Sequence, residues 1–555
     1  MTVKRRTFLL GAAGALVLPA TARAARDTLT IGLSQFPSTL HPNIESMAAK
    51  SSVLGFCHRP FTAYDARWQR IAMLATSVPS IEAGDAAIVE RPDGTRGVRC
   101  RYTIQEGARW GDGRPVTTED VVFTWEVGRH PQSGVGNGEL YRRIERVEVH
   151  DERSFTLHVT KLTFDYAGID DFRVLPAHVE RARFQADPVA YKERTAYITD
   201  PANRGLYFGP YRVAEVASGS HIILEPNPTW WGRAPAFRRI VVRTIENTAA
   251  MEANLLAGEI DMIAGELGVT LDQAIAMQRR IGDRYDFTHK AGLVYEHIDL
   301  NLDNPILADR RVRRALLVGC DRATLVRQLF DNRQPVAATF VSPLDWVADA
   351  DLPPARFDPR EAAGLLDAAG WTQLRDGIRH NAAGDRLALD LMTTAGNRSR
   401  ELVQQVLQSQ WRRLGIDVRL RNEAPRTFFG ETTRNRRFAA MAMYAWISSP
   451  ENVPRSTLYS GEIPRAENGF SGQNYPGFRN PEMDGLIDRI EVELDRERRR
   501  AMWQRIQRIY ADEIPVLPLF FRADTFITPR WLKGIEPTGH LHPTSLWAES
   551  WHVQE

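Results

Sequence analysis

Two strand–helix–strand units, far apart along the chain, constrain its fold more than any other feature. The first unit spans residues 240–263, where Gly258 ends the helix, and the second spans 387–420, where Gly415 occupies the usual left-handed cap position. A helix between two strands implies a crossover connection and parallel strand pairing. We therefore predict an α/β protein with two lobes, each built on its own sheet.

Size and charge narrow the class of protein further. A chain of 555 residues exceeds what one hydrophobic core supports, so two or three domains are expected. Lysine and arginine total 71 and aspartate and glutamate 69, which gives a formal charge of +2. Because nucleic-acid binders concentrate basic charge, this balance argues against a nucleic-acid partner.

Residues 1–25 have the pattern of an export signal. The basic start Lys4-Arg5-Arg6 precedes an apolar stretch at 8–20 and a small-residue cleavage site that ends at Ala24. The run from Arg5 to Leu10 resembles a twin-arginine signal, which exports folded proteins, and an ordinary secretion signal with two arginines is the alternative. Because no cysteine follows the cleavage site, we expect a soluble periplasmic protein without a lipid anchor.

Three cysteines remain in the mature chain, Cys57, Cys100 and Cys320. Their spacing matches no CxxC motif of metal or redox sites. An oxidising compartment permits one disulfide, for which Cys57 and Cys100 are the candidates, whereas burial as free thiols is the alternative.

Motifs of enzyme chemistry are largely missing from the sequence. It contains no phosphate-binding loop, no dinucleotide-binding GxGxxG after a strand and no HExxH, and the run 469–473 lacks the last glycine of a nucleophile elbow. His540 and His542 form a close pair that lacks a third metal ligand. We therefore predict no catalytic residue, no metal site and no cofactor.

Aromatic residues beside turn signals are the positive signal for a binding site. Large rings in loops supply apolar contact at a low cost in side-chain entropy. The alternative is that such rings fill the core, which we prefer for the pair Trp230-Trp231. The candidate ligand contacts of this kind are Tyr444, Trp446, Phe470, Tyr475 and Trp346.

Short motifs spread along the mature chain carry a family resemblance. In chain order they are Gly107-Ala108-Arg109-Trp110-Gly111-Asp112-Gly113-Arg114-Pro115 with Thr118-Glu119-Asp120-Val121-Val122-Phe123, Gly209-Pro210-Tyr211, Leu224-Glu225-Pro226-Asn227-Pro228 with Trp230-Trp231-Gly232, Leu256-Ala257-Gly258-Glu259-Ile260-Asp261, Arg311-Val312-Arg313-Arg314-Ala315-Leu316 with Asp321-Arg322, and Asp358-Pro359 with Leu365-Leu366-Asp367-Ala368-Ala369-Gly370-Trp371. Together and in this order, they resemble extracellular solute-binding protein family 5, the oligopeptide-, dipeptide- and nickel-binding group of ABC importer components.

The resemblance implies a fold and its division along the chain. The expected fold is a two-lobed α/β periplasmic binding protein, type II and cluster C-like, with an extra inserted subdomain. The chain would cross between the lobes near 285 and near 520, which would give a two-strand hinge. The expected segments are lobe I at 26–57, 205–285 and 521–555, the inserted subdomain at 58–204, and lobe II at 286–520.

The resemblance also implies where a ligand lies. The loop from Phe36 to His41 and the region around Tyr295 are expected to face the cleft. The segment 444–450 is similar to a family stretch that usually carries an aspartate for the free amino group of a peptide, but Ser448 and Ser449 stand there and the nearest acid is Glu451.

This departure implies either a ligand without a free amine or substitution by Glu451. Arg426 is a candidate partner for a ligand carboxylate, and an ordinary surface arginine is the alternative.

The implied function is capture of a peptide-like small ligand by the periplasmic substrate-binding component of an ABC importer. We expect a monomer that passes its ligand to an inner-membrane permease, without enzymatic activity. A carrier of a metal complex, opine or oligosaccharide on the same fold is the alternative, and a periplasmic hydrolase is a more distant one.

Overall fold

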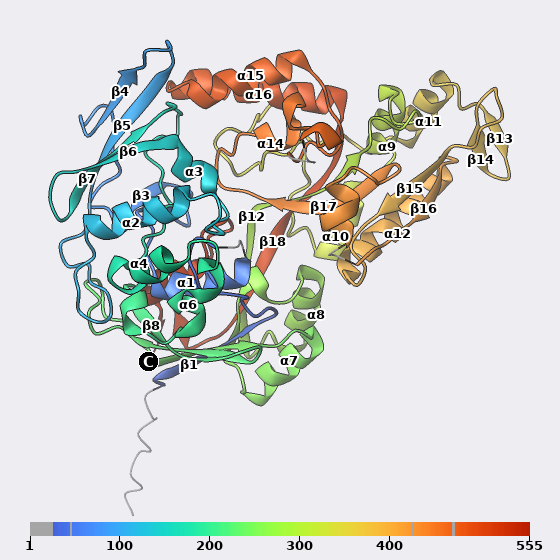
Figure 1. The fold of residues 1–555 in the computed structure, drawn as a ribbon. Helices are drawn as coiled ribbons and strands as arrows, with labels where there is room; N and C mark the ends of the chain where they lie inside the picture. Colours follow the sequence, from blue (N-terminus) through green and yellow to red (C-terminus); the bar gives the residue numbers. More distant parts are fainter. Residues whose placement is uncertain (1–25, 45–46, 425–426, 469–471, 555) are drawn as a thin grey trace, which may run out of the picture.

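One large sheet extends from the strands around β1 (Thr28–Leu33) to those around β15 (Ala388–Met392) (Figure 1). The computed structural model describes residues 26–44, 47–424, 427–468 and 472–554, so the predicted export signal lies outside the described residues. The ten strands of this sheet, in spatial order, are β16 (Asp417–Leu420), β15 (Ala388–Met392), β17 (Met441–Ile447), β12 (Tyr285–Leu300), β18 (Val516–Pro529), β11 (Met262–Ile263), β1 (Thr28–Leu33), β10 (Arg239–Thr244), β9 (His221–Pro226) and β8 (Tyr211–Ala217).

Two long strands make this sheet continuous. β12 and β18 pair antiparallel along most of their length, and the register shifts between Ala291 and Tyr295. At one end of this pair β18 also pairs with β11, and at the other end β12 also pairs with β17. The prediction of a separate sheet for each lobe was therefore wrong, because two strands continue from one half of the molecule into the other.

The first predicted strand–helix–strand unit is confirmed. β1 pairs parallel with both β10 and β11, and α7 (Thr248–Ala257) connects β10 to β11. The side chain of Asn247 accepts hydrogen bonds from two backbone N–H groups at the start of α7. Gly258 ends the helix with a left-handed φ of 75°, a conformation that favours glycine.

The second unit is confirmed as well. β15 and β16 pair parallel, and α12 (Arg398–Arg413) connects them. The buried face of α12 includes Val403, Leu407 and Trp411, whose indole N–H donates to the Leu316 carbonyl over 2.9 Å. This face packs into the largest core cluster of this half of the molecule.

The inserted segment has a sheet of its own. Its four strands, in spatial order, are β4 (Ala86–Glu90), β5 (Arg96–Thr103), β7 (Ser154–Val159) and β6 (Ile144–Val149). A separate core that contains Phe61, Tyr102 and Trp110 lies against this sheet. However, Phe123 of α2 (Thr118–Arg129) and Tyr191 belong to the core cluster of β1, so this segment packs on two cores, and the predicted domain limits stay a prediction.

One helix prediction was wrong. The charged, amphipathic pattern of residues 489–510 predicts one helix, but the structure divides this stretch between α15 (Pro481–Val492) and α16 (Arg496–Glu513). The side chain of Asp495 accepts a hydrogen bond from the Arg498 N–H, so it caps α16 and starts a new helix there.

The other elements are short or flank these sheets. They are α1 (Ala48–Cys57), β2 (Thr62–Tyr64), β3 (Arg70–Ala72), α3 (Gly138–Arg143), α4 (Ala177–Ala186), α5 (Tyr191–Arg194), α6 (Ala196–Thr199), η1 (Arg204–Leu206), η2 (Gly265–Leu267), α8 (Leu271–Ile281), α9 (Arg310–Val318), α10 (Arg322–Phe330), α11 (Pro359–Ala368), β13 (Gln373–Arg375), β14 (Ile378–His380), η3 (Phe428–Thr433), α14 (Arg455–Leu458), η4 (Ser460–Glu462), η5 (Ala466–Asn468), β19 (Leu532–Lys533), η6 (Thr544–Ser550) and β20 (His552–Val553).

Cys57, Cys100 and Cys320 are all free and buried, so the possible Cys57–Cys100 disulfide does not form. Burial raises the pKa of the Cys100 thiol to about 12, as expected for an inert thiol in a core. Over the described ranges of the chain, no helix combines the length and the apolar character that crossing a membrane requires.

Candidate functional site

Consecutive residues of β12 point to opposite faces of the central sheet, as the pleat of a strand requires. Tyr295, His297 and Asp299 line a cavity on one face. Glu296 lines a different cavity on the other face. A single strand therefore serves two candidate ligand sites.

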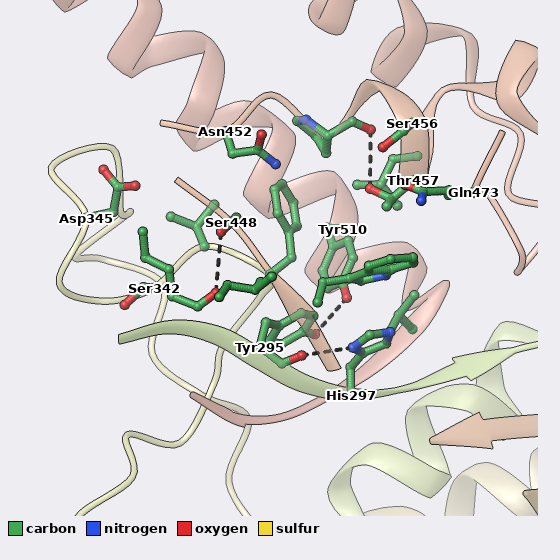
Figure 2. A pocket seen from close by; sticks show the side chains of 18 of the residues that line it. Tyr295, His297, Ser342, Asp345, Ser448, Asn452, Ser456, Thr457, Gln473 and Tyr510 are labelled. Carbon is green, nitrogen blue, oxygen red and sulfur yellow. Dashed lines mark hydrogen bonds between the residues drawn. The ribbon is translucent and has the colours of Figure 1, made fainter. Parts of the chain in front are cut away.

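The first of these cavities, which we call the aromatic cavity, has a volume of about 130 Å³. Figure 2 shows that its labelled side chains come from β12, the loop at 342–345, the segment 448–457 and α16. Its lining residues are Leu293, Tyr295, His297, Asp299, Phe340, Val341, Ser342, Asp345, Val347, Trp446, Ile447, Ser448, Ser449, Asn452, Pro454, Ser456, Thr457, Leu458, Gln473, Pro476, Trp503, Tyr510 and Val516.

Paired strands bring the aromatic rings of this cavity together. Trp446 lies opposite Tyr295 across the β12–β17 ladder, and Tyr444 lies opposite His297. The Tyr295 and Tyr510 hydroxyls share a hydrogen bond of 2.9 Å (Figure 2), which ties β12 to α16. The ring of Tyr295 stacks on that of His297, with centroids 5.0 Å apart.

The polar end of the aromatic cavity is built from His297 and Asp299, both almost fully buried. His297 Nδ1 lies 3.1 Å from the Tyr295 carbonyl, to which it donates (Figure 2). His297 Nε2 has no hydrogen-bond partner, although it lies 3.4 Å from Asp299 Oδ1. The Tyr444 hydroxyl donates to the other oxygen of Asp299, and burial raises the pKa of this tyrosine well above its usual range.

A second carboxylate, Asp345, also lines the aromatic cavity and was missed by sequence reasoning. Burial raises its pKa, while the backbone N–H groups of Glu451 and Val347 act in the opposite direction. The Glu451 N–H donates to its Oδ2 over 2.8 Å. The only sequence signal was its place next to Trp346 in a Ser-Pro-containing loop.

Four of the predicted site residues, Tyr295, Trp446, Ser448 and Ser449, line the aromatic cavity. The Ser448 hydroxyl donates to the Leu293 carbonyl over 3.4 Å (Figure 2), which joins the end of β17 to β12.

Two further predicted residues, Tyr444 and Tyr475, are buried behind this lining, and Tyr475 packs on the ring of Trp446 with centroids 6.1 Å apart.

Other predicted residues lie beside the cavity or away from it. The guanidinium group of Arg496 lies over the ring of Trp346, with its central carbon 4.1 Å from the ring centroid. Glu451 pairs with Arg499 over 2.6 Å and lines a neighbouring cavity, which shares Ser449 and Asn452 with the aromatic one.

Phe36 packs partly buried against the core of β1. His41 is fully buried in the same half, where burial and then Lys50 lower its pKa well below its usual range. Arg426 and Phe470 lie outside the described residues.

The second cavity, which we call the arginine cavity, has a volume of about 400 Å³ and walls from both halves of the molecule. Ser34 and Gln35, beside Phe36, form part of one wall. Ser399 at the start of α12 donates to Asp272 of α8 over 3.0 Å, which links the two walls. This lining includes no residue of the predicted cleft loop, Phe36 to His41, which follows Gln35.

A buried charge cluster forms the centre of the arginine cavity. Glu296 accepts hydrogen bonds of 2.7 Å from both Arg400 and Arg522. Burial alone would raise the pKa of Glu296, but the two guanidinium groups outweigh burial and lower it to about 2. The formal charges of the arginine-cavity lining balance, because it contains two arginines, Arg400 and Arg522, and two acids, Glu296 and Asp524.

The histidine pair has a structural role. His540 is bonded to the Asp65 carbonyl over 3.0 Å, and His542 lies 3.3 Å from Asp170. Both contacts join the C-terminal segment to the inserted segment. Among the residues described, no group of three His, Cys, Asp or Glu side chains is placed to hold a metal ion.

Comparison with known proteins decides the family. The model of the bacterial extracellular solute-binding proteins, family 5 (middle region), matches residues 74–463. This chain belongs to that family.

An oligopeptide-binding protein of Bacillus subtilis, AppA, is 24% identical over 530 residues, which cover 94% of this chain and 91% of the relative. The crystal structure of an oligopeptide-binding protein from Thermus thermophilus, complexed with a pentapeptide, superposes with a TM-score of 0.77 at 28% identity, over 95% of this chain and 96% of that one. The structure of NikA from Brucella suis, in complex with Fe(III)-EDTA, gives a TM-score of 0.78 at 20% identity, over 95% and 100% of the two chains.

These similarities confirm the predicted α/β periplasmic-binding fold and the predicted family. The chain is thus a solute-binding protein, and the two cavities of β12 are the candidates for its ligand site.

Proposed function

We propose that this solute-binding protein captures a peptide-like small ligand in the periplasm and delivers it to an inner-membrane ABC permease. The observation that supports the proposal most is the aromatic cavity, because it is lined by the segment that the family resemblance singled out, with Trp446, Ser448 and Ser449 in its wall. Apolar rings combined with a few polar groups are the usual lining of a small-molecule site.

The work of the protein is binding without chemical change. A ligand favours the closed form only through contacts that it makes better there, and residues from both halves supply such contacts. Micromolar affinity corresponds to about −8 kcal/mol, which buried rings and a few hydrogen bonds provide after entropy losses. The permease then recognises the closed form.

The arginine cavity supports a peptide-like ligand in particular. Arg522 is only partly buried, and its pairing with Glu296 leaves donor capacity beside a cavity of ligand size. A terminal carboxylate is the peptide group that a guanidinium binds bidentately. Because the aromatic cavity lies on the opposite face of the sheet, one small ligand occupies only one of the two cavities, and the arginine cavity is the second candidate.

The substitution Trp446→Ala tests the proposal. Calorimetric titration with a pool of tri- to pentapeptides is expected to show at least about tenfold weaker binding than in the wild type, because Trp446 is a large ring in the cavity wall. Trp230→Ala is the matched control, since Trp230 packs on Trp231 with centroids 4.3 Å apart and lies outside both cavities. Consumption of a peptide by pure protein would contradict the proposal and favour a hydrolase.

Native mass spectrometry of protein purified from its own periplasm would supply the ligand mass directly. A co-purified mass in the peptide range supports the proposal. A co-purified metal complex, opine or oligosaccharide would instead support the alternative ligand class for the same site.

The role of Glu451 is tested with matched free and N-acetylated peptides. In this structure Glu451 already pairs with Arg499, and the side chains of both are largely buried. If Glu451 binds the ligand amine, Glu451→Gln abolishes a preference for the free peptide. If the preference persists in Glu451→Gln, another carboxylate binds the amine.

A further inference from the structure

We infer that the aromatic cavity binds the cationic N–H head of a ligand, an ammonium or a guanidinium, between His297 and Asp299. This inference rests on the proposed function and adds the chemical class of the group that the site selects. It starts from an arrangement of acceptors that a bound donor would complete.

One backbone contact orients the ring of His297. A carbonyl oxygen only accepts, so Nδ1, at 3.1 Å from the Tyr295 carbonyl, donates to it. The neutral tautomer that this contact selects offers Nε2 as an acceptor, and this atom is buried without a hydrogen-bond partner in a side chain that is 1% exposed. A buried unpaired acceptor is costly, which favours any ligand that donates to it.

The neighbour of Nε2 is another acceptor. Asp299 Oδ1 lies 3.4 Å away, and Tyr444 donates to the second carboxylate oxygen rather than to this one. Two acceptors side by side bind one group well, namely a donor with more than one N–H. A charged donor gains additional free energy because hydrogen bonds to ionised groups are stronger than neutral ones.

The described lining of the aromatic cavity carries acidic side chains and neither lysine nor arginine. The two acids are Asp299 and Asp345. The rings of Tyr295 and Trp446 add faces that attract a cation. Val341 and Val347 offer an apolar wall for the aliphatic stem that carries such a head group.

A panel of four tripeptides separates charge from donor capacity. N-acetyl-Ala-norleucine-Ala has neither an ammonium nor a guanidinium group, N-acetyl-Ala-Lys-Ala and N-acetyl-Ala-Arg-Ala have a donor cation, and the trimethyllysine analogue has charge without N–H. By calorimetry, the lysine or the arginine peptide is expected to bind the wild type at least about tenfold more tightly than the norleucine peptide. The trimethyllysine peptide is expected to lose most of this gain.

The variant Asp299→Asn removes the charge and keeps a carbonyl oxygen for the Tyr444 hydroxyl. We expect it to lose the preference for the donor cation, so that the lysine and arginine peptides bind this variant no more tightly than the norleucine peptide does. Asp303→Asn is the matched control, since Asp303 pairs with Arg436 and lies outside the cavity lining. This control is expected to retain the full preference.

Three results would overturn the inference. One is equal affinity for the lysine, arginine and norleucine peptides, and another is full retention of the gain by the trimethyllysine peptide. The third is loss of the preference in Asp345→Asn but not in Asp299→Asn, which would place the cation at the loop carboxylate.

A second experiment, with small molecules in place of peptides, separates this inference from the proposed function. Thermal shifts are measured with butylammonium, butylguanidinium, butyltrimethylammonium and pentanol. If no peptide binds but the first two fragments stabilise the wild type and not Asp299→Asn, the inference stands and the peptide proposal fails. If peptides bind and the fragments give equal shifts, the proposal stands and the inference fails.

Discussion

Glu296 is a buried carboxylate of the arginine cavity that forms ion pairs with two arginines, Arg400 and Arg522. Its carboxylate is 2% exposed and is held between two guanidinium groups, one on α12 and one on β18. Removing one partner of such a buried cluster leaves uncompensated charge, which is strongly destabilising. These two ion pairs also make the free energy of unfolding depend on pH, because the guanidinium groups favour the ionised form of Glu296.

For Glu296, we predict an acid-sensitive part of the stability. The pKa of the folded state, about 2, lies below the ordinary value of 4.5, so the stabilisation is complete above about pH 5 and is lost as the pH falls toward 2. Glu296→Gln is expected to lower the free energy of unfolding at pH 7 by about 3 kcal/mol and to flatten its decline in acid. Urea titrations from pH 7 to pH 3 measure both effects.

An exposed glutamate serves as the control for that series. Glu259 pairs with Arg243 at the surface, so Glu259→Gln is expected to change the free energy of unfolding by less than about 0.5 kcal/mol at each pH. Parallel pH profiles of the wild type and Glu296→Gln would contradict the proposed origin of the acid sensitivity.

Asp120 is a second residue with a decisive local role. Its carboxylate accepts hydrogen bonds from the Trp110 indole N–H and from the backbone N–H groups of Thr117 and Ala177. We expect Asp120→Ala to lower the free energy of unfolding by about 3 kcal/mol or more, because two buried donors and one partly buried donor lose their partner. The neighbouring Glu119→Ala, whose side chain is 72% exposed, should stay within about 0.5 kcal/mol in the same thermal or urea unfolding assay.

At the scale of the element, short-range signals determined how much was predictable. α7 and α12 were located correctly because their caps and apolar spacing lie within the element itself. The break between α15 and α16 was missed because Asp495 is one polar residue among many in a charged stretch. The continuity of the central sheet was missed because pairing of β12 with β18 joins residues more than two hundred positions apart, as in Glu296 with Arg522.

The left-handed cap of α7 gives a prediction for a pair of glycines. Gly258→Ala is expected to lower the free energy of unfolding by about 1 kcal/mol, since a Cβ is unfavourable at a φ of 75°. Gly364→Ala, inside α11 and with open space around the new Cβ, is expected to raise it by about 0.5 to 1 kcal/mol. Urea unfolding of both variants measures the opposite signs, and equal signs would contradict the assignment of the cap.

At the scale of the whole molecule, the sequence located one part of the candidate site and missed another. The end of β17 and the two serines after it were found because these aromatic and serine residues stand next to turn signals and fall in a family motif. Asp345, His297 and Asp299 were missed because they are ordinary residues in a loop and a strand, and only the fold brings them together. The two-cavity arrangement follows from the pairing of β12 with β17 and β18, which sequence spacing does not reveal.

The export route is a prediction that concerns the whole chain. Replacing Arg5 and Arg6 together by lysine is expected to retain the precursor in the cytoplasm, because a twin-arginine signal depends on both guanidinium groups whereas a general secretion signal needs only positive charge. Cell fractionation and immunoblotting measure the result. Lys4→Gln is the control, and normal export of the double lysine variant would favour the general secretion route.

The alternation of side chains along β12 has a consequence for how relatives of this protein diversify. Substitutions at odd-numbered positions such as 295, 297 and 299 alter one chamber, while a change at 296 alters the other, so the two specificities are free to drift separately. Inserting or deleting a single codon in this strand would exchange the two sets of side chains and destroy both chambers at once. Evolution at this strand is therefore tolerant of replacement and intolerant of changes in length.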